Sequence, residues 1–177
     1  MATKVAQSLL KYGQVGCAIR AGVEIPPRIM QVMCELDPQT CVDSEDCYNA
    51  FNEMSRHEIA ECLREVDPDL YDYFIAYYHR PSYQFFRLAN GTIVCPALSS
   101  VGVQQGDPAG GLIFDIVYTF KVLKPLCEAH PNATVFAIHD DTYIVTKTPA
   151  ELGGVAVDLV KFAEPLLHRN AARRRAD

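Results

Sequence analysis

Short runs of alternating or β-branched apolar residues predict five β-strands in this chain. Four of these runs are residues 83–88, 92–95, 134–138 and 142–146, and a fifth short strand is expected to end near Asp46. Asn90-Gly91, between the first two runs, is the strongest turn signal for a short hairpin. The polar residues 139–141 separate the last two runs in the same way. Two β-hairpins are therefore expected.

Helical periodicity and N-terminal signals predict several helices. Ser55 followed by Glu58 matches a capping box, which begins a helix that extends to about Glu65. Asp67-Pro68 begins the next helix, which ends near Tyr78. Further helices are expected over residues 111–129, after Pro108, over residues 149–167, and from Pro26-Pro27 onward in the glycine-interrupted segment 13–36. The order β-α-α-β-β-α-β-β-α predicts an α+β fold in which helices pack on an antiparallel sheet.

Composition narrows the class of protein. The chain has 177 residues, of which 49% are hydrophobic, so one domain with a substantial core is expected. No apolar run is long enough to predict a membrane span, and the N-terminus lacks the apolar stretch of a signal peptide. The 7 cysteines are an odd number without a C-x-x-C pair, which favours reduced thiols over a disulfide framework or a zinc site. We therefore expect an intracellular protein, cytoplasmic or nuclear, with no membrane partner.

The net charge of −6 argues against a nucleic-acid-binding protein, since such proteins usually carry basic patches. The charge is, however, unevenly distributed. Residues 37–69 contain 10 acidic and 2 basic residues, so the rest of the chain has a net charge of about +2. The acidity is thus concentrated around Asp46 and in the helix that follows it. A strong positive channel for phosphates is missing from the sequence.

Three polar segments carry the candidate chemistry. Asp46 follows the first predicted strand, Gln105-Gly106-Asp107-Pro108 precedes the long apolar helix, and Asp140-Asp141 lies in the second hairpin turn. Asp46 and Asp140 are far apart in the sequence, so only tertiary folding can bring them together. Carboxylate oxygens are ligands that Mg²⁺ prefers. Carboxylates that converge from separate strands can hold the two divalent metals that activate a hydroxyl nucleophile.

In this order, the three segments resemble the palm of a nucleic-acid polymerase, and specifically that of the reverse transcriptases of non-LTR retrotransposons. Residues 46–52 (DCYNAFN), followed by Ser55-Arg56, resemble the first catalytic motif of that family. Residues 99–108 (SSVGVQQGDP) closely match its glutamine-glycine-aspartate-proline segment, and residues 136–141 (FAIHDD) resemble its aspartate-pair motif. The similarity spans roughly residues 14–160.

The resemblance implies RNA-directed DNA synthesis by two-metal catalysis. Asp46 and Asp140 would bridge two Mg²⁺ ions, for which Mn²⁺ could substitute, and Asp141 would support the site or act as a further ligand. The backbone carbonyl of Cys47 is another candidate metal ligand. The chemistry would be in-line attack of a primer 3′-hydroxyl on an α-phosphate. The partners would be an RNA or DNA template with its primer, and deoxynucleoside triphosphates.

The resemblance also implies a nucleotide side of the site. Phe51 corresponds to the aromatic residue that lies beneath the sugar in the family and excludes a 2′-hydroxyl, which selects deoxynucleotides. Gln105 and Gly106 would line the nucleotide and the template, because glycine allows close approach of the backbone.

Several features depart from the family pattern. Asp43 and Glu45 stand in a strand that is apolar in the family, and burying both carboxylates would be costly. Ile138 stands where an aromatic residue is expected, the basic fingers residues are almost absent and no thumb follows. We therefore expect a truncated copy with little activity alone. Its parts would be a remnant of the fingers or pre-palm segment (residues 1–36), the palm (residues 37–167) and a basic tail (residues 168–177).

Each motif also has a simpler explanation. An isolated Asp-Asp pair is usually turn chemistry, Gln-Gly-Asp-Pro can be a loop that enters a helix N-terminus, and Phe51 can be a core aromatic residue. His57, His79, His130 and His168 have no metal-ligand spacing and are expected to be surface or interface residues. The alternatives for the whole chain are therefore an inactive retroelement remnant and another metal-dependent phosphotransferase.

Overall fold

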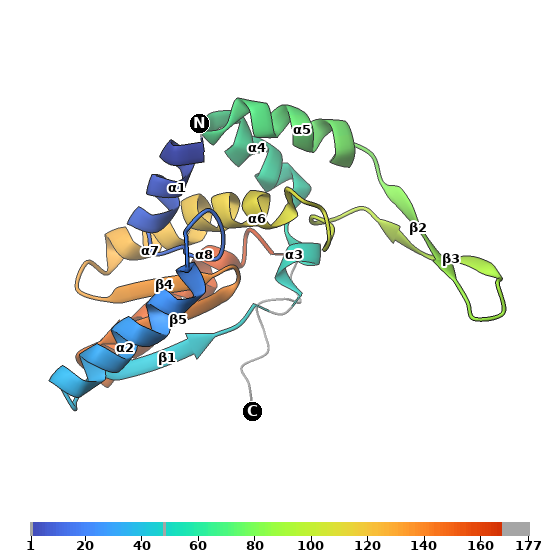
Figure 1. Ribbon diagram of the computed structural model, residues 1–177. Helices are drawn as coiled ribbons and strands as arrows, with labels where there is room; N and C mark the ends of the chain where they lie inside the picture. The colour runs from blue at the N-terminus through green and yellow to red at the C-terminus, as the bar shows by residue number, and fades with distance from the viewer. Residues whose placement is uncertain (1, 48, 168–177) are drawn as a thin grey trace.

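The computed structural model describes residues 2–47 and 49–167. Its centre is a three-stranded antiparallel sheet in the order β1-β5-β4 (Figure 1). The strands are β1 (Cys41–Glu45), β4 (Thr134–Ile138) and β5 (Asp141–Thr146). β4 and β5 form the hairpin predicted from the sequence, whereas β1 comes from an earlier part of the chain and pairs with the other edge of β5.

Burial differs between the central strand and the edge strand of this sheet. Ile144 and Val145 of β5 are both fully buried, as expected for a strand that has neighbours on both sides. β1 has one neighbour, and Asp43 and Glu45 are only half-buried in it. Because both carboxylates keep contact with water, the burial cost expected from their position in the strand does not arise.

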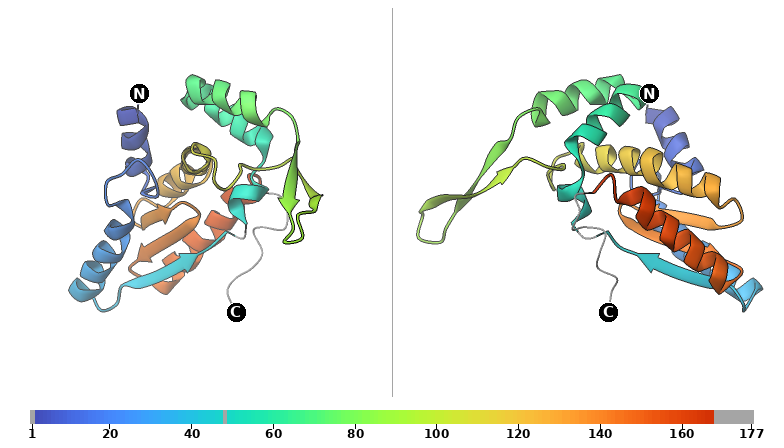
Figure 2. Two further views of the ribbon diagram at one scale, coloured as in Figure 1. Left: turned by 45° about the vertical axis from the view of Figure 1, so that its right-hand side comes forward. Right: turned by 180° about the vertical axis from the view of Figure 1, so that it is seen from behind.

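Helices cover both faces of the sheet. α8 (Pro149–Ala163) crosses one face and contacts β1 and β5, and α2 (Ile25–Leu36) lies over the opposite face (Figures 1 and 2). The predicted α+β fold is therefore confirmed. None of the described helices is both long and apolar enough to cross a membrane. The helices outside these two layers are α1 (Ala2–Lys11), η1 (Gly22–Glu24), α3 (Ala50–Glu53), α4 (Arg56–Val66), α5 (Pro68–Tyr78), α6 (Gly110–Tyr118), η2 (Thr119–Leu123) and α7 (Lys124–Ala129).

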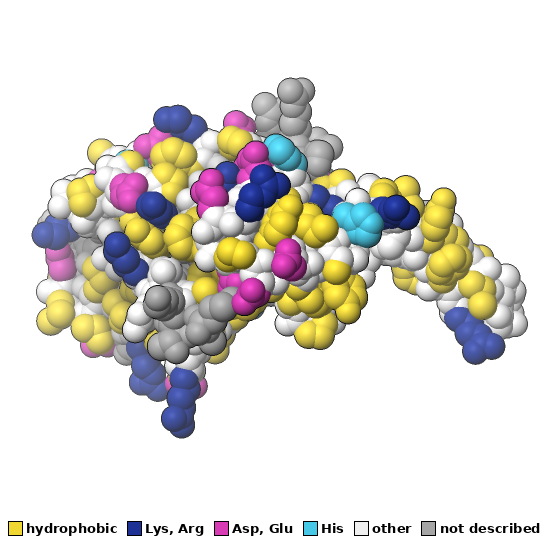
Figure 3. Space-filling model, turned by 90° about the horizontal axis from the view of Figure 1, so that it is seen from above, with side chains coloured by type: hydrophobic (Ala, Val, Ile, Leu, Met, Phe, Trp, Pro, Cys, Tyr) yellow, Lys and Arg dark blue, Asp and Glu magenta, His cyan; other side chains and the backbone are white. Residues whose placement is uncertain are grey.

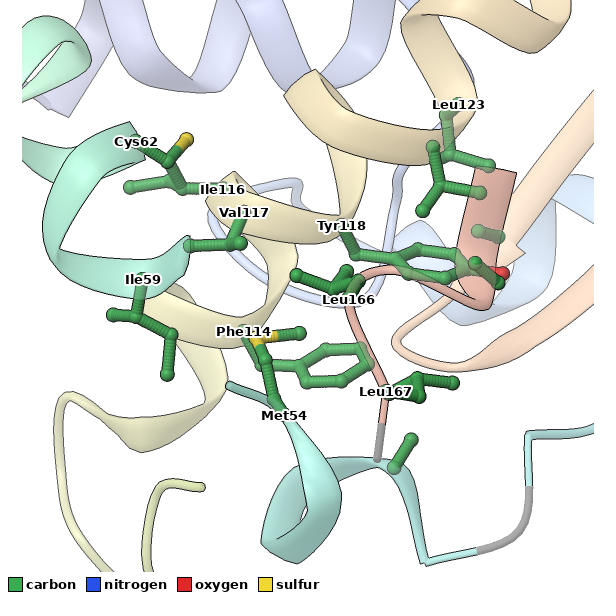
Figure 4. Close-up of a cluster of buried hydrophobic side chains, with 14 of the residues drawn as sticks. Met54, Ile59, Cys62, Phe114, Ile116, Val117, Tyr118, Leu123, Leu166 and Leu167 are labelled. Atoms are coloured by element: carbon green, nitrogen blue, oxygen red, sulfur yellow. The ribbon is translucent and has the colours of Figure 1, made fainter. Parts of the chain in front are cut away.

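The core is centred on α6, which is buried along most of its length (Figure 4). Phe114 and Tyr118 of this helix are fully buried, and their rings stack with centroids 5.5 Å apart. Met54, Ile59 and Leu166 belong to the same cluster and come from three other parts of the chain. Burying a side chain of this size stabilises the fold by about 1.5–3 kcal/mol.

The hairpin predicted around Asn90-Gly91 projects away from this body. β2 (Ser82–Arg87) and β3 (Ile93–Ser99) form a separate two-stranded sheet (Figure 1). Its register shifts between Gln84 and Phe86, opposite Pro96, which has no N–H to donate to a partner strand. Hydrophobic side chains lie along its surface (Figure 3), and Tyr83 and Phe85 are 70% and 69% exposed. The hairpin thus contributes little to the core.

Most element boundaries agree with the sequence predictions, with three corrections. The capping box is half formed: Ser55 Oγ accepts from the Glu58 amide, but the Glu58 carboxylate pairs with Lys121 instead of the Ser55 N–H. The helix expected over residues 149–167 ends at Ala163. The segment expected as one helix over residues 111–129 is continuous but contains a π-helical turn, η2. The helix α1 was not expected.

Candidate functional site

The three candidate aspartates lie at one end of the sheet. The last pair between β1 and β5 is Glu45 with Thr142, so Asp46 and Asp141 are the next residues in that register. Asp140 is the second residue of the turn that joins β4 and β5, which pairs Ile138 with Asp141. The fold therefore brings together carboxylates from parts of the chain that are far apart in sequence.

Electrostatics indicate that these carboxylates repel one another. Burial raises the pKa of Asp140 above its usual value, and the negative charges of Asp141 and Asp46 raise it further. Burial and the charge of Asp46 likewise raise the pKa of Asp141. The adjacent His139 acts in the opposite direction on both groups. A cation at this end of the sheet would relieve the repulsion.

The donor set is appropriate for Mg²⁺ or Mn²⁺, but the side chains are not positioned around one ion. The carboxylate oxygens of Asp46, Asp140 and Asp141 do not all lie within 4.8 Å of one another; among the described residues, the group that does so is His57, Glu58 and Glu61. The aspartates fit a metal by chemistry and by location, and side-chain rotation is needed for them to share an ion. The exposed group on α4 shows that His57 does have acidic neighbours, which its sequence spacing did not suggest.

Cys47 is half-buried beside the aspartates. Its carbonyl oxygen accepts a hydrogen bond from Ala50 N at 3.2 Å, which leaves one lone pair for another partner. Burial raises the pKa of its thiol to about 11, so the side chain is a neutral thiol at physiological pH and a poor metal ligand. Only the carbonyl remains a candidate ligand at this residue.

Phe51 lies between the core and the aspartate turn. Its ring stacks on Phe114 with centroids 4.3 Å apart and meets the His139 ring edge-on at 5.7 Å. The Phe51 carbonyl accepts from Val103 N at 2.8 Å, which ties α3 to the segment before Gln105. The simpler explanation offered for Phe51, a core aromatic residue, therefore holds for one face of its ring.

The loop that contains Gln105 and Gly106 is exposed and lies just before α6. Gly106 has a φ of +95°, and no atom lies within 4 Å of the position that its Cβ would occupy. The loop is fixed by the next residue, Asp107, which accepts hydrogen bonds from the hydroxyls of Tyr73 and Tyr78 and from Ala109 N.

Asp107 is a structural anchor, and α6 begins three residues later at Gly110, within one residue of the start predicted from the sequence. Burial raises the pKa of the Asp107 carboxyl, but the hydrogen bonds from Tyr78, Ala109 N and Tyr73 outweigh this effect, and the pKa lies below its usual value. Burial, followed by the hydrogen bond to Asp107, raises the pKa of the Tyr78 phenol to about 12. Asp107 thus fixes the loop to α5, while Gln105 and Gly106 are exposed to solvent.

Two buried polar residues of α6 contact the site and were missed in the sequence. Asp115 Oδ1 lies 2.9 Å from His139 Nδ1, and Tyr118 Oη lies 2.9 Å from Thr142 Oγ1. A spacing of three residues places both on one helical face. Burying an aspartate within the otherwise apolar segment Gly110–Tyr118 costs free energy unless the carboxylate is paired. The isolated acidic residue was therefore the feature of the sequence that could have indicated a partner for Asp115.

The comparisons with known proteins identify the fold. Neither a protein-family model nor a curated protein sequence matches the chain. Among solved structures, apo telomerase from Candida tropicalis, truncated from its C-terminal domain, matches with a TM-score of 0.59 and 15% identity over 93% of this chain and 37% of that one. Telomerase from Candida albicans in complex with a TWJ fragment of telomeric RNA matches with a TM-score of 0.56 and 12% identity over 94% of this chain and 29% of that one.

These similarities show a reverse-transcriptase-like fold, consistent with a polymerase palm. The identities are too low to show more than the fold. The chain spans about a third of the length of the telomerase chains that it matches.

Proposed function

We propose that this chain is the palm of a reverse transcriptase, of the type found in non-LTR retrotransposons, which transfers deoxynucleotides to a primer 3′-hydroxyl. The observation that carries the proposal is the convergence of Asp46 with Asp140 and Asp141 at one end of a sheet whose fold is similar to that of telomerase. Residues 37–167 would form the palm, and residues 1–36 would belong to the fingers or pre-palm segment.

The acidic residues would hold the metal ions. Asp46 and Asp140 would be ligands to both ions, Asp141 would complete the negative site, and the free lone pair of the Cys47 carbonyl would be a further donor. When bound, two Mg²⁺ or Mn²⁺ ions would activate the primer hydroxyl and neutralise charge on the departing pyrophosphate. The raised pKa values of Asp140 and Asp141 support this assignment, since they reflect burial first and then the neighbouring negative charges.

Phe51 and the Gln105-Gly106 loop would form the nucleotide side. The Phe51 ring is braced against Phe114, so it cannot move away from a sugar placed over it. Such a rigid ring would exclude a 2′-hydroxyl and select deoxynucleotides. Gln105 and Gly106 would contact the nucleotide and template through an exposed backbone, which the open space around Gly106 supports.

The partners of this function are a primed RNA or DNA template and deoxynucleoside triphosphates. Two of the similar telomerase structures are complexes with a fragment of telomeric RNA, which supports a nucleic-acid partner. The function implies an intracellular location, in the cytoplasm or nucleus. Because the net charge is −6, we expect weak synthesis by this chain alone.

One observation favours the alternative of a non-catalytic remnant. The carboxylate oxygens of Asp46, Asp140 and Asp141 do not all lie within 4.8 Å of one another, so the site is not assembled without metal. A metal-dependent phosphotransferase of another kind would need the same carboxylates but would have no use for Phe51 as a sugar gate.

Single-nucleotide primer extension tests the proposal. The purified chain is given Mn²⁺, a primed RNA template and either a deoxynucleotide or the matching ribonucleotide. We expect slow incorporation of the deoxynucleotide, a loss of at least about 100-fold in Asp46→Asn and Asp140→Asn, and entry of ribonucleotides in Phe51→Ala. The exposed Asp72→Asn is the matched control.

Three other results would reject the proposal. Incorporation that survives Asp140→Asn would show that the aspartates are not the metal site. Nucleotide hydrolysis without a template would favour another phosphotransferase. No incorporation of the deoxynucleotide by the parent chain would favour the inactive remnant.

A further inference from the structure

Gln14 holds the backbone of the residue that precedes Asp140. The Gln14 side chain is completely buried, and its amide bonds both polar backbone groups of His139. His139 N donates to Gln14 Oε1 at 3.1 Å, and Gln14 Nε2 donates to the His139 carbonyl at 2.9 Å. The two residues are 125 positions apart in the chain. The Gln14 amide thus satisfies the backbone N–H and the carbonyl of His139, the first residue after β4.

The segment around Gln14 is fixed against β4. Val15 N donates to the Ala137 carbonyl at 2.8 Å, and Ala137 N donates to the Gly13 carbonyl at 2.9 Å. Any Cβ at Gly13 would collide with the Val135 carbonyl, and any Cβ at Gly16 would collide with His139 N. Glycine at both positions therefore permits the close approach that brings the Gln14 amide to the turn.

A second contact holds the side chain of His139. Its Nδ1 lies 2.9 Å from Oδ1 of Asp115, whose side chain is fully buried in α6. The Cys17 thiol also interacts with this carboxylate, but His139 is the partner that can carry a compensating positive charge. His139 itself has a φ of 58°, a left-handed conformation that is uncommon for residues other than glycine, although His adopts it more often than most.

We propose that Gln14 and Asp115 are positioning residues that hold the β4–β5 turn so that Asp140 and Asp141 face Asp46. The inference rests on the proposed function for the role of the turn. Gln14 fixes both backbone groups of the residue before Asp140, and Asp115 fixes its ring. Neither residue touches a metal or a substrate, and both act through His139. Residues that orient metal ligands in this way typically change metal affinity by 10–100-fold when they are replaced.

A purely structural role would lower the stability of the whole domain without a specific effect on the turn. The test therefore compares Gln14→Met, which keeps the length of the side chain but no hydrogen bonds, with Leu126→Ala. Leu126 is fully buried in α7, outside the turn, and its truncation serves as the destabilised control. Conditions are chosen so that both variants lie equally far below their melting temperatures.

Two readouts separate the positioning role from general stability. The first is hydrogen exchange at the His139 amide, measured by NMR without metal. The second is the affinity for Mn²⁺, measured from the electron paramagnetic resonance signal of the free ion, with Asp140→Asn as the reference for a lost ligand. We expect Gln14→Met to speed His139 exchange and to weaken Mn²⁺ binding, each by about 10-fold or more relative to Leu126→Ala.

Asp115 is tested by a conservative pair of variants. Asp115→Asn keeps an oxygen that can accept from His139 Nδ1, so it should retain most of the Mn²⁺ affinity, whereas Asp115→Ala should lose about as much as Gln14→Met. Equal losses in both Asp115 variants would overturn its positioning role.

The outcomes distinguish this inference from the proposed function. Exchange at His139 that is unchanged in Gln14→Met, or faster exchange with unchanged Mn²⁺ affinity, would overturn the positioning role and leave the metal site intact. If the parent binds no Mn²⁺ that depends on Asp140, the proposed function fails. The exchange measurement alone then decides whether Gln14 holds the turn.

Discussion

The acidic side chains at the end of the sheet lie close enough together to affect one another's charge. Asp140 and Asp141 are adjacent in sequence, and Asp46 lies beside Asp141 across β1 and β5. Burial raises the pKa values of Asp140 and Asp141, and the neighbouring negative charges raise them further, so the fold contains unfavourable repulsion. His139 offsets part of it, and Asp115 holds that histidine in place.

This repulsion predicts that Asp140→Asn stabilises the protein without metal. Removing one charge from partly exposed groups should raise the free energy of unfolding by about 0.2–1 kcal/mol at neutral pH. Millimolar Mn²⁺ should raise the melting temperature of the parent, because only the native state binds it, and should have little effect on Asp140→Asn. Thermal melts with and without Mn²⁺ measure both effects. Identical responses in the two proteins would count against a metal site at Asp140.

The Asp107 anchor predicts an alkaline transition. Folding raises the pKa of the Tyr78 phenol to about 12, so the stability from this group is fully present below about pH 10 and is lost as the pH rises through about 12. A phenolate absorbance titration of the parent minus that of Tyr78→Phe should show a midpoint near 12. Asp107→Asn should move this midpoint towards 10, and a midpoint already near 10 in the parent would refute the anchor.

At the scale of elements, local signals in the sequence were sufficient for most of the fold. Asn90-Gly91, Asp67-Pro68 and the β-branched runs around residues 139–141 specify structure through short-range chemistry, and each lies where it was predicted. The missed features depend on contacts between distant segments. Gln14 binds His139, and Asp115 approaches it from α6; neither pairing has a local pattern that a sequence reveals. The end of α8 was missed because its last turn gives way to an antiparallel bridge between Met54 and Leu167.

The contact between α3 and the loop before α6 predicts that replacing two glycines by alanine has opposite effects on the free energy of unfolding. Gly102 has a φ of +66°, and a Cβ there would collide with the Phe51 carbonyl, so Gly102→Ala should destabilise the protein by about 2 kcal/mol or more. Gly153 lies in α8 with open space around it, so Gly153→Ala should stabilise by about 0.5–1 kcal/mol. Urea unfolding measures both, and a similar loss in the two variants would contradict the described packing.

At the scale of the whole molecule, the chain combines a polymerase-like fold with few positive charges. Its net charge is −6, and it spans about a third of the telomerase chains that it matches. The β2–β3 hairpin adds exposed apolar surface (Figure 3). Arg87 is the last residue of β2. From this charge balance we expect the chain to retain a nucleic-acid duplex weakly.

This imbalance predicts weak and salt-sensitive binding of a primed template. Because phosphate contacts dominate affinity, the dissociation constant should lie in the non-specific range of about 10⁻⁶–10⁻⁴ M and should rise steeply with salt. Fluorescence anisotropy with a labelled RNA–DNA duplex at several salt concentrations measures both. Tight binding that is insensitive to salt would contradict this prediction.

The central claim is that Asp46, Asp140 and Asp141 form one metal site. A crystal structure determined with Mn²⁺ and a deoxynucleoside triphosphate, using the anomalous signal of the metal, tests it most directly. The account predicts anomalous peaks between Asp46 and Asp140, with ligand oxygens at about 2.0–2.6 Å. Peaks confined to the exposed group of His57, Glu58 and Glu61 on α4, with none beside the aspartates, would contradict it.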